Sequence, residues 1–307
     1  MKLKKTGVIA ICLALAITVG AVFAAAEERM STSPVAENFE LRTYRGIAIG
    51  GQLKAVSPDG GTLTYEISTQ PTKGEIELHE NGGFVYTPTK GKKGRDYFGY
   101  KAYDAKNNVS AEATVIIKIE KQKTAIAYSD MQTNGTHYAA VLLAENDIFI
   151  GERIGGEYVF LPDTPVSRGE FLTMCLKLND FDILSGVITT GFADDSEIPA
   201  YQKPYVSTAL LTGVVNGYSD GMRSAVFNSD NQISYTEAAV MLNKSMNLTD
   251  VNTASYGGSA PVWAVQSCAN LSACRIADAE MSSGANALTR ADCARLLSEA
   301  ARVLENR

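Results

Sequence analysis

The most regular pattern in the sequence lies between residues 34 and 120, where apolar and polar residues alternate over short stretches. Turn-forming clusters of glycine, asparagine, aspartate and proline separate these stretches at intervals of roughly ten residues. Short strands of period two with turns between them are typical of an antiparallel β-sandwich. The stretches that predict strands are residues 62–67, 75–78, 83–87, 97–103 and 113–119. The last one places Val115, Ile117 and Ile119 on one face, which we expect to complete the core.

The pattern changes after a short polar segment, residues 121–125, which we expect to be a linker. Beyond it, apolar residues recur every three or four positions, as they do on one face of a helix. A hydroxyl residue followed three positions later by an acid, the capping-box pattern, occurs three times. The pairs are Ser167/Glu170, Ser234/Glu237 and Thr289/Asp292. We expect a helix to begin directly after each hydroxyl residue.

An aromatic residue stands at a nearly constant distance before each capping pair. Tyr138 precedes Arg168 by 30 residues, Tyr205 precedes Tyr235 by 30, and Trp263 precedes Arg290 by 27. Each aromatic residue begins another apolar stretch, and loops follow that contain glycine in the first two cases. Equal spacing found twice, with a small deletion in the third case, indicates an internal repeat. The sequence therefore predicts three repeats, at residues 126–186, 187–250 and 251–307.

Composition and charge narrow the class of protein. The chain has 307 residues, 45% of them hydrophobic and 20% charged, which excludes a wholly disordered chain and is enough for about two domains. The net charge of −6 argues against nucleic-acid binding. From residue 121 onward there are 13 basic and 21 acidic residues, so the predicted repeats are the acidic half. Only two histidines are present, too few for a histidine-rich metal site.

The first 26 residues have the pattern of a secretory signal. Lys2, Lys4 and Lys5 precede an apolar stretch, and Ala24–Ala26 supplies small residues for cleavage. The stretch is also about long enough to be an uncleaved membrane anchor, which is the alternative. A lipoprotein signal at Cys12 has little support because the bulky Ile11 precedes that cysteine.

The remaining cysteines, Cys175, Cys268, Cys274 and Cys293, do not have zinc-ligand spacing. Cys175 and Cys293 fall on the apolar faces of predicted helices. We favour buried free thiols over a Cys274–Cys293 disulfide.

Residues 34–120 resemble the bacterial immunoglobulin/cadherin-like repeat of cell-surface proteins. The resemblance lies in the motifs at residues 59–65, 83–88 and 94–100, together with Pro71 and Gly74. It implies an immunoglobulin-like sandwich that serves as a spacer, an adhesin or a sugar-binding module. Some relatives bind calcium through loop aspartates, and the candidates here are Asp59, Asp96 and Asp104. They stand alone rather than in one dense acidic loop, so we favour turn formation over calcium binding.

Residues 126–307 resemble the S-layer homology (SLH) family. The matching motifs are residues 128–130 and 192–194 (aromatic-x-Asp), 137–139 and 262–264 (the aromatic helix start), 217–221 (Gly-Tyr-x-Asp-Gly), and the three capping boxes. The resemblance implies a mostly α-helical unit of pseudo-threefold symmetry whose grooves bind secondary cell-wall polysaccharide, typically bearing a pyruvate ketal. Two departures stand out. Tyr235 replaces a frequent arginine, and the third repeat has residues 279–284 in place of the Gly-Tyr loop, so one groove is expected to be inactive.

Arg168 and Arg290 each occupy the first position of a predicted helix, where the helix dipole disfavours a cation by roughly 0.3–1 kcal/mol. An anion resolves this conflict, because a carboxylate can accept from the guanidinium and from the helix N–H groups together. The alternative is that the arginines pair with Glu170 and Asp292 or extend into water. Sugar binding also needs flat apolar faces with polar groups beside them. The predicted ligand-binding residues are Arg168, Arg290, Tyr218, Asp220, Trp263, Tyr138, Asp130 and Asp194.

The resemblances together predict a two-domain protein, an immunoglobulin/cadherin-like sandwich followed by an SLH unit, exported and anchored non-covalently to the cell wall at the cell surface. Its expected partner is secondary cell-wall polysaccharide, with the sandwich as spacer or display module. The alternative is an adhesin or glycan-binding protein whose sandwich binds other surface proteins or glycans. The third hypothesis is a hydrolase that acts on the cell wall, but the sequence contains no recognisable catalytic, metal-binding or cofactor-binding motif.

Overall fold

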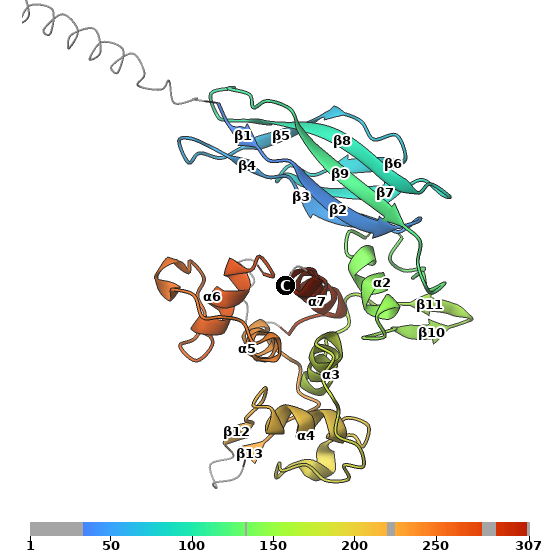
Figure 1. Cartoon of the computed structure of the whole chain (residues 1–307), viewed down its shortest axis with the longest axis vertical. Coiled ribbons are helices and arrows are strands. Elements are labelled where there is room, and N and C mark those ends of the chain that lie inside the picture. The colour runs from blue at the N-terminus through green and yellow to red at the C-terminus, as the bar shows by residue number, and fades with distance from the viewer. Residues whose placement is uncertain (1–32, 133, 220–224, 278–286, 306–307) are drawn as a thin grey trace, which may run out of the picture.

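The computed structural model describes residues 33–132, 134–219, 225–277 and 287–305. These form a β-sandwich and a helical part that lie one above the other (Figure 1). The predicted signal segment 1–26, the candidate site residue Asp220 and residues 279–284 lie outside the described residues.

The sandwich contains all five predicted strand stretches as β5 to β9, together with four strands that the alternation did not reveal. The strands are β1 (Val35–Ala36), β2 (Phe39–Tyr44), β3 (Ile49–Gln52), β4 (Ala55–Val56), β5 (Thr64–Thr69), β6 (Gly74–Leu78), β7 (Gly83–Pro88), β8 (Gly94–Tyr103) and β9 (Ala113–Glu120). One sheet has the order β2-β9-β8-β5 and the other β3-β7-β6, while β1 pairs with β4. Val115, Ile117 and Ile119 are buried between the sheets, as their alternation predicts.

The prediction of a wholly antiparallel sandwich is wrong at one edge. β2 and β9 run parallel, with Leu41 opposite Ile117, whereas β8 and β9 are antiparallel, with Phe98 opposite Val115. Two strands that are joined by a tight hairpin turn must run antiparallel, whereas strands far apart in the sequence can pair in either direction. β2 and β9 stand near the two ends of the domain, so no hairpin constrains their direction.

Two of the three aspartates considered for calcium make local hydrogen bonds. Asp59 accepts from Gly61 N at 3.2 Å, and Asp104 accepts from Asn108 N at 2.8 Å, as turn-forming aspartates do. Asp96 is different because it is buried in β8 and accepts from the Tyr86 hydroxyl at 2.8 Å. The described ranges contain no group of three or more histidine, cysteine, aspartate or glutamate side chains placed to hold a metal ion.

In the residues that the structure describes, the helical part consists of paired helices with two small hairpins and two short 3₁₀ turns. Its elements are α2 (His137–Glu145), β10 (Glu152–Ile154), β11 (Glu157–Val159), α3 (Arg168–Leu178), η1 (Asp195–Glu197), α4 (Lys203–Leu211), β12 (Tyr218–Ser219), β13 (Ala225–Val226), α5 (Tyr235–Met246), η2 (Thr253–Ser255), α6 (Val265–Ala273) and α7 (Arg290–Glu305). All three predicted capping pairs form, and α3, α5 and α7 begin at the residues predicted.

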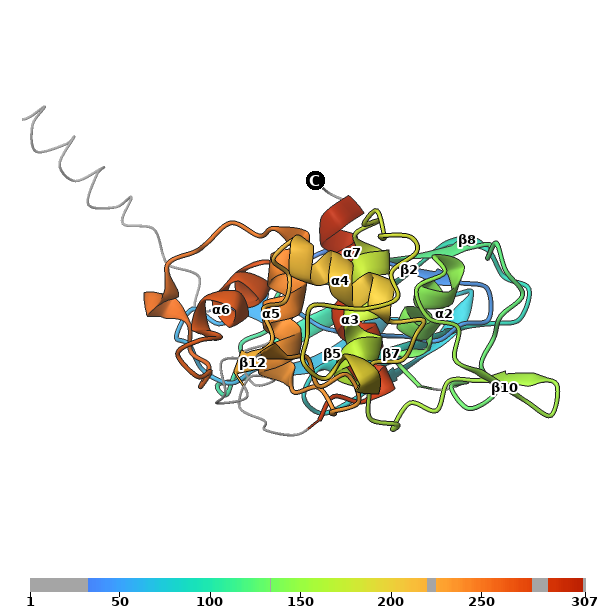
Figure 2. The ribbon, with the colours of Figure 1, turned by 90° about the horizontal axis from the view of Figure 1, so that it is seen from below.

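The residues just before the three caps are joined in a closed ring of backbone hydrogen bonds. Val166 N donates to Leu288 O at 2.9 Å, Leu288 N to Ile233 O at 2.9 Å, and Ile233 N to Val166 O at 3.0 Å. The leading helix of each predicted repeat packs on the capped helix of another, so that α2 contacts α7, α4 contacts α3, and α6 contacts α5. From below, α5 and α6 lie on one side of α3 and α2 on the other (Figure 2).

The helical part is docked against the sandwich through its backbone. Gly50 N in β3 donates to Gly135 O at 2.7 Å. A Cβ added to Gly50 would lie 3.2 Å from Gly135 Cα, so the two chains approach closely because neither residue has a side chain. Ile47 of the sandwich is buried in the helical core, and the rings of Tyr44 and Tyr138 lie 5.4 Å apart. The two domains therefore share packing and are not joined by the linker alone.

Cys175, Cys268 and Cys293 are buried, Cys274 is half-buried, and all four are free. This confirms the interpretation as free thiols and excludes the Cys274–Cys293 disulfide in this structure. No helix in the described part of the chain combines the length and the apolar character that crossing a bilayer requires.

Candidate functional site

Arg168 begins α3 where the first and second predicted repeats meet. Its own N–H donates to Asn231 O at 2.8 Å, and Gly169 N donates to Ser229 O at 2.9 Å. Glu170 N donates to Ser167 Oγ at 3.2 Å. The N–H groups of the first turn are therefore bound to protein acceptors. The expectation that a ligand carboxylate also accepts from these groups is wrong, because a neighbouring loop supplies carbonyl oxygens in its place.

The guanidinium of Arg168 is enclosed by two aromatic rings. Its Cζ lies 4.6 Å from the centre of the Tyr218 ring and 5.2 Å from that of Phe227. Nη1 donates to Tyr218 Oη at 2.8 Å and lies 3.6 Å from Glu237 Oε1. The residue is only 7% exposed, and its Nε has no hydrogen-bond partner among the described residues. Burial lowers the pKa of Arg168, but a guanidinium stays charged at neutral pH.

Glu237 is the acid beside Arg168, although the sequence suggested Glu170. It also closes the cap of α5 by accepting from Ser234 N at 2.9 Å, and it accepts a hydrogen bond from Tyr218 Oη. Burial by itself raises the pKa of Glu237, but these donors and Arg168 outweigh it and hold the pKa below its usual value. Burial and the bond to Glu237 raise the pKa of Tyr218 to about 12, so this phenol is a neutral donor.

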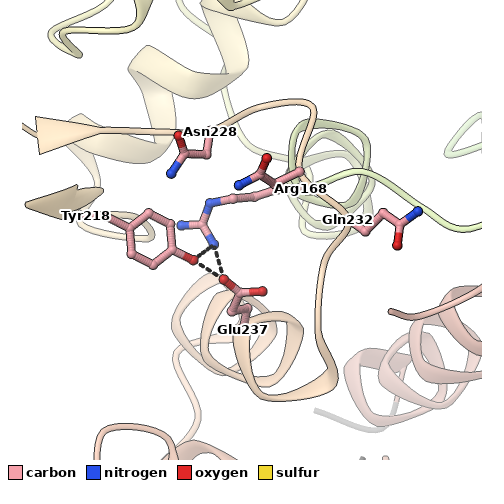
Figure 3. A pocket seen from close by; sticks show the side chains of 6 residues that line it. Arg168, Tyr218, Asn228, Gln232 and Glu237 are labelled. Atoms are coloured by element: carbon pink, nitrogen blue, oxygen red, sulfur yellow. Dashed lines mark hydrogen bonds and ion pairs between the residues drawn. The ribbon is translucent and has the colours of Figure 1, made fainter. Parts of the chain in front are cut away.

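These side chains line a cleft of about 270 Å³, which we name the first cleft. Its lining residues are Arg168, Tyr218, Asn228, Asn231, Gln232 and Glu237 (Figure 3). No hydrogen bond engages the carboxamide groups of Asn228, Asn231 or Gln232 within the described part of the chain. The cleft combines a cation, a carboxylate, an aromatic ring and amides that can donate and accept, which suits a hydroxyl-rich ligand carrying an acidic group.

Arg290 occupies the corresponding position at the start of α7. Its N–H donates to Thr164 O at 2.9 Å, and Nη1 donates to Phe160 O at 3.1 Å. Nη2 forms an ion pair with Glu152 Oε1 at 2.9 Å. The acid that pairs with Arg290 is therefore Glu152 and not Asp292, which the alternative interpretation named. A second cleft, of about 310 Å³, lies beside it and is lined by Leu161, Pro162, Asp163 and Thr164.

Asp130 and Asp194 are predicted as polar groups for sugar binding, but neither lines the first or the second cleft. Each carboxylate instead accepts hydrogen bonds from two successive backbone amides. Those of Asp130 come from residues 160–161 at 2.9 and 2.7 Å, and those of Asp194 from residues 227–228 at 2.9 and 2.7 Å. A carboxylate can only accept, and unpaired backbone amides are its natural donors in a buried loop. Both aspartates therefore position the loops that reach the arginines.

Tyr138 and Trp263 also lie away from both clefts. Tyr138 packs against Tyr44 under the sandwich, and this interdomain contact could not be read from the repeat pattern. Trp263 is 61% exposed just before α6 and lines neither cleft. Of the predicted site residues, the first cleft brings together Arg168 and Tyr218, and Arg290 stands beside the second.

The sequence reading missed Glu237, Asn228, Asn231 and Gln232 as cleft residues. Glu237 was identified only as a helix cap, although its place in the repeat is equivalent to that of Glu170. The three amides precede the second capping box and have a hydrogen-bonding chemistry that the corresponding part of the first repeat lacks. An alignment of the two loops against each other would have revealed this difference.

Two family models match the chain, in the predicted order. Residues 31–121 match the bacterial cadherin-like domain, and residues 191–239 match the S-layer homology domain. Five of the six residues of the first cleft lie inside the second match. No curated protein matches the sequence of the chain. The chain thus carries a cadherin-like domain followed by an S-layer homology domain.

Solved structures resemble only part of the chain. An endo-fucoidan hydrolase of glycoside hydrolase family 107 is 16% identical with a TM-score of 0.26, over 31% of this chain and 14% of that one. The SrpA adhesin of Streptococcus sanguinis is 20% identical with a TM-score of 0.26, over 38% of this chain and 79% of that one. Human protocadherin-24 is 14% identical with a TM-score of 0.25, over 31% and 48%. The chain thus matches well under two thirds of the hydrolase, and TM-scores this low carry no functional argument.

Proposed function

We propose that this chain is an exported, non-enzymatic surface protein that its helical part holds non-covalently on the cell wall. The S-layer homology match indicates cell-wall anchoring, and such domains in general bind cell-wall polysaccharide. The cadherin-like match indicates a surface or adhesin role. In this proposal the ligand is an anionic secondary cell-wall polysaccharide whose terminal sugar bears a pyruvate ketal.

We further propose that the three predicted repeats assemble into one unit of pseudo-threefold symmetry. The closed ring of hydrogen bonds among Val166, Ile233 and Leu288 supports this, because each residue holds the same place before its cap. The cyclic packing of leading helices on capped helices supports it as well. In this arrangement the first cleft lies between the first and second predicted repeats.

The observation that carries the proposal is the state of Arg168. Arg168 is only 7% exposed, so all donors of its guanidinium would be expected to have acceptors, but Nε has no partner among the described residues. A carboxylate is the strongest acceptor for such a group. The carboxylate of a pyruvate ketal next to sugar hydroxyls would use both the guanidinium and the amides of the first cleft.

The sandwich has the role of a spacer or display module in this proposal. The Gly50–Gly135 contact supports that role, because a docked domain projects from the wall in one orientation. The second candidate function is that of an adhesin whose sandwich binds another surface protein or glycan, and the cadherin-like match favours it. Retention of such binding by a chain that no longer binds the wall would support this second function.

Co-sedimentation of the full chain with purified cell-wall sacculi tests the proposal. We expect the wild-type chain to sediment with intact sacculi and to stay in solution with sacculi stripped of secondary polysaccharide. Replacing Arg168 and Arg290 together by alanine should weaken binding more than tenfold without changing the helical circular dichroism signal.

The matched control is Arg302→Ala, which removes the same charge from an exposed position on α7. We expect this variant to bind as the wild type does. Equal affinity of the double variant and the wild type would contradict the proposed role of Arg168, and sedimentation with stripped sacculi would contradict the ligand.

A further inference from the structure

The two clefts are built on the same backbone. Arg168 N donates to Asn231 O and Gly169 N to Ser229 O, while Arg290 N donates to Thr164 O and Ala291 N to Pro162 O. Phe227 and Phe160 are buried at equivalent positions, and the residue after each has a positive φ, 58° at Asn228 and 54° at Leu161. The glycine before each hairpin has φ 76° in both cases, at Gly217 and Gly151. Positions in the two clefts can therefore be compared one to one.

The first difference is at the residue after that glycine. In the first cleft it is Tyr218, which stacks on Arg168 and donates its hydroxyl proton to Glu237. In the second it is Glu152, whose carboxylate lies 2.9 Å from Arg290 Nη2. Because Phe160 O binds Nη1, both terminal nitrogens of Arg290 already have acceptors. A ligand carboxylate would have to displace Glu152 to reach these nitrogens, whereas Nε of Arg168 has no partner among the described residues.

The second difference is in the loop before the cap. The amides Asn228, Asn231 and Gln232 of the first loop correspond to Leu161, Thr164 and Pro165 in the other. The second loop therefore has two apolar residues where the first has carboxamides, and one of them, Leu161, lines the second cleft. The second cleft lacks the three carboxamide groups of the first cleft, each of which can both donate to and accept from sugar hydroxyls.

We infer that the chain holds its acidic saccharide in the first cleft alone. Glu152, which pairs with Arg290, and the loop of residues 161–165 make the second cleft unable to bind it. This inference rests on the proposed function, since it concerns the same ligand. The specificity-determining residues are Tyr218 and the three amides, because an arginine begins the capped helix beside each cleft. Binding then has a stoichiometry of one saccharide per chain.

Isothermal titration of the full chain with purified pyruvylated wall oligosaccharide tests this inference. We expect one site per chain in the wild type, a loss of affinity of more than tenfold in Arg168→Ala, and a change of less than twofold in Arg290→Ala. Two equivalent sites, or equal losses in the two variants, would overturn it. Absence of binding by the wild type would instead contradict the proposed function, so the two failures are distinguishable.

A matched pair of variants removes the concern that Arg168→Ala disturbs the fold. Asn228→Leu copies into the first cleft the residue that Leu161 already provides at the same positive φ in the second, so the backbone tolerates it. We expect it to weaken binding at least fivefold with an unchanged melting temperature. Leu161→Asn is the reciprocal control and should leave affinity unchanged. Equal affinities of both variants with the wild type would overturn the role of the amides.

Discussion

The sandwich and the helical part both bury charged side chains, but they treat these groups differently. In the sandwich, Asp96 is buried and all its acceptor capacity is used by donors on neighbouring strands and turns. In the helical part, Arg168 is buried to a similar degree and keeps a donor without a partner among the described residues. A saturated polar group holds the fold together, whereas an unsaturated one in a cleft is available to a ligand. Substitutions at the first kind should therefore cost stability, and at the second kind they should cost binding.

Asp96→Ala should have the largest effect on stability. It leaves the Tyr86 hydroxyl and the amides of Thr72 and Lys73 without an acceptor in a buried site, so we expect a loss of about 3 kcal/mol. Urea unfolding, with hydrogen exchange in β7 and β8 as the local probe, measures it. Asp59→Ala, at a half-exposed turn, is the control and should change the stability by less than about 0.5 kcal/mol. An Asp96 variant as stable as this control would show that the network is not structural.

Acid should weaken the helical part through His137. Burial lowers the pKa of His137 to about 4, and its Nδ1 has no partner among the described residues. The unfolded state therefore binds the proton first, and stability is lost as the pH falls from about 6.5 toward 4. We expect about 2 kcal/mol to be lost between pH 6.5 and 5. Thermal unfolding across this range should show the slope in the wild type, and a His137→Gln variant with the same slope would exclude this residue as the cause.

Loss of a cap should have a smaller effect. Ser234→Ala removes the acceptor of Glu237 N at the start of α5 and should cost about 1 kcal/mol. The substitution also removes the hydrogen bond that Ser234 Oγ donates to the Glu237 carboxylate, so one residue of the first cleft loses a partner. The corresponding change in α3, Ser167→Ala, should cost the same stability. A much larger loss in only one of them, measured by thermal unfolding, would contradict their equivalence.

Salt should have the smallest effect of all. The predicted repeats are acidic, so the long-range field does not attract an anionic polymer and binding depends on short contacts in the cleft. Raising sodium chloride from about 50 to 150 mM should change the dissociation constant by less than about threefold. A tenfold change in a titration series would indicate a broad electrostatic surface instead.

The sequence predicted the features that depend on neighbouring residues. The capping pairs and the alternating strands are local patterns, and α3, α5 and α7 begin where Ser167, Ser234 and Thr289 place them. It failed where a partner comes from far along the chain. Glu237 beside Arg168, Glu152 beside Arg290, and the parallel pairing of β2 with β9 are long-range choices that no local spacing encodes.

Site residues divide in the same way. Arg168 was identified because a cation at a helix start is locally unfavourable, which one can see in the sequence. The recurring motif of Asp130 and Asp194 predicts that they bind the ligand. Their backbone partners, however, lie 30 and 33 residues farther along the chain, where no local pattern points to them. Tyr138 is predicted to contact the ligand, but its ring packs against Tyr44 of the sandwich, a contact that no pattern within the repeats encodes.

The most direct test of the central claim is a double-mutant cycle between Arg168 and the acidic group of the sugar. It compares titrations of the wild-type and Arg168→Ala chains with pyruvylated oligosaccharide and with the same oligosaccharide after mild acid removal of the ketal. We predict that removing the ketal weakens binding to the wild type more than tenfold and leaves binding to the variant nearly unchanged. Equal losses in both chains would show that Arg168 does not hold the carboxylate.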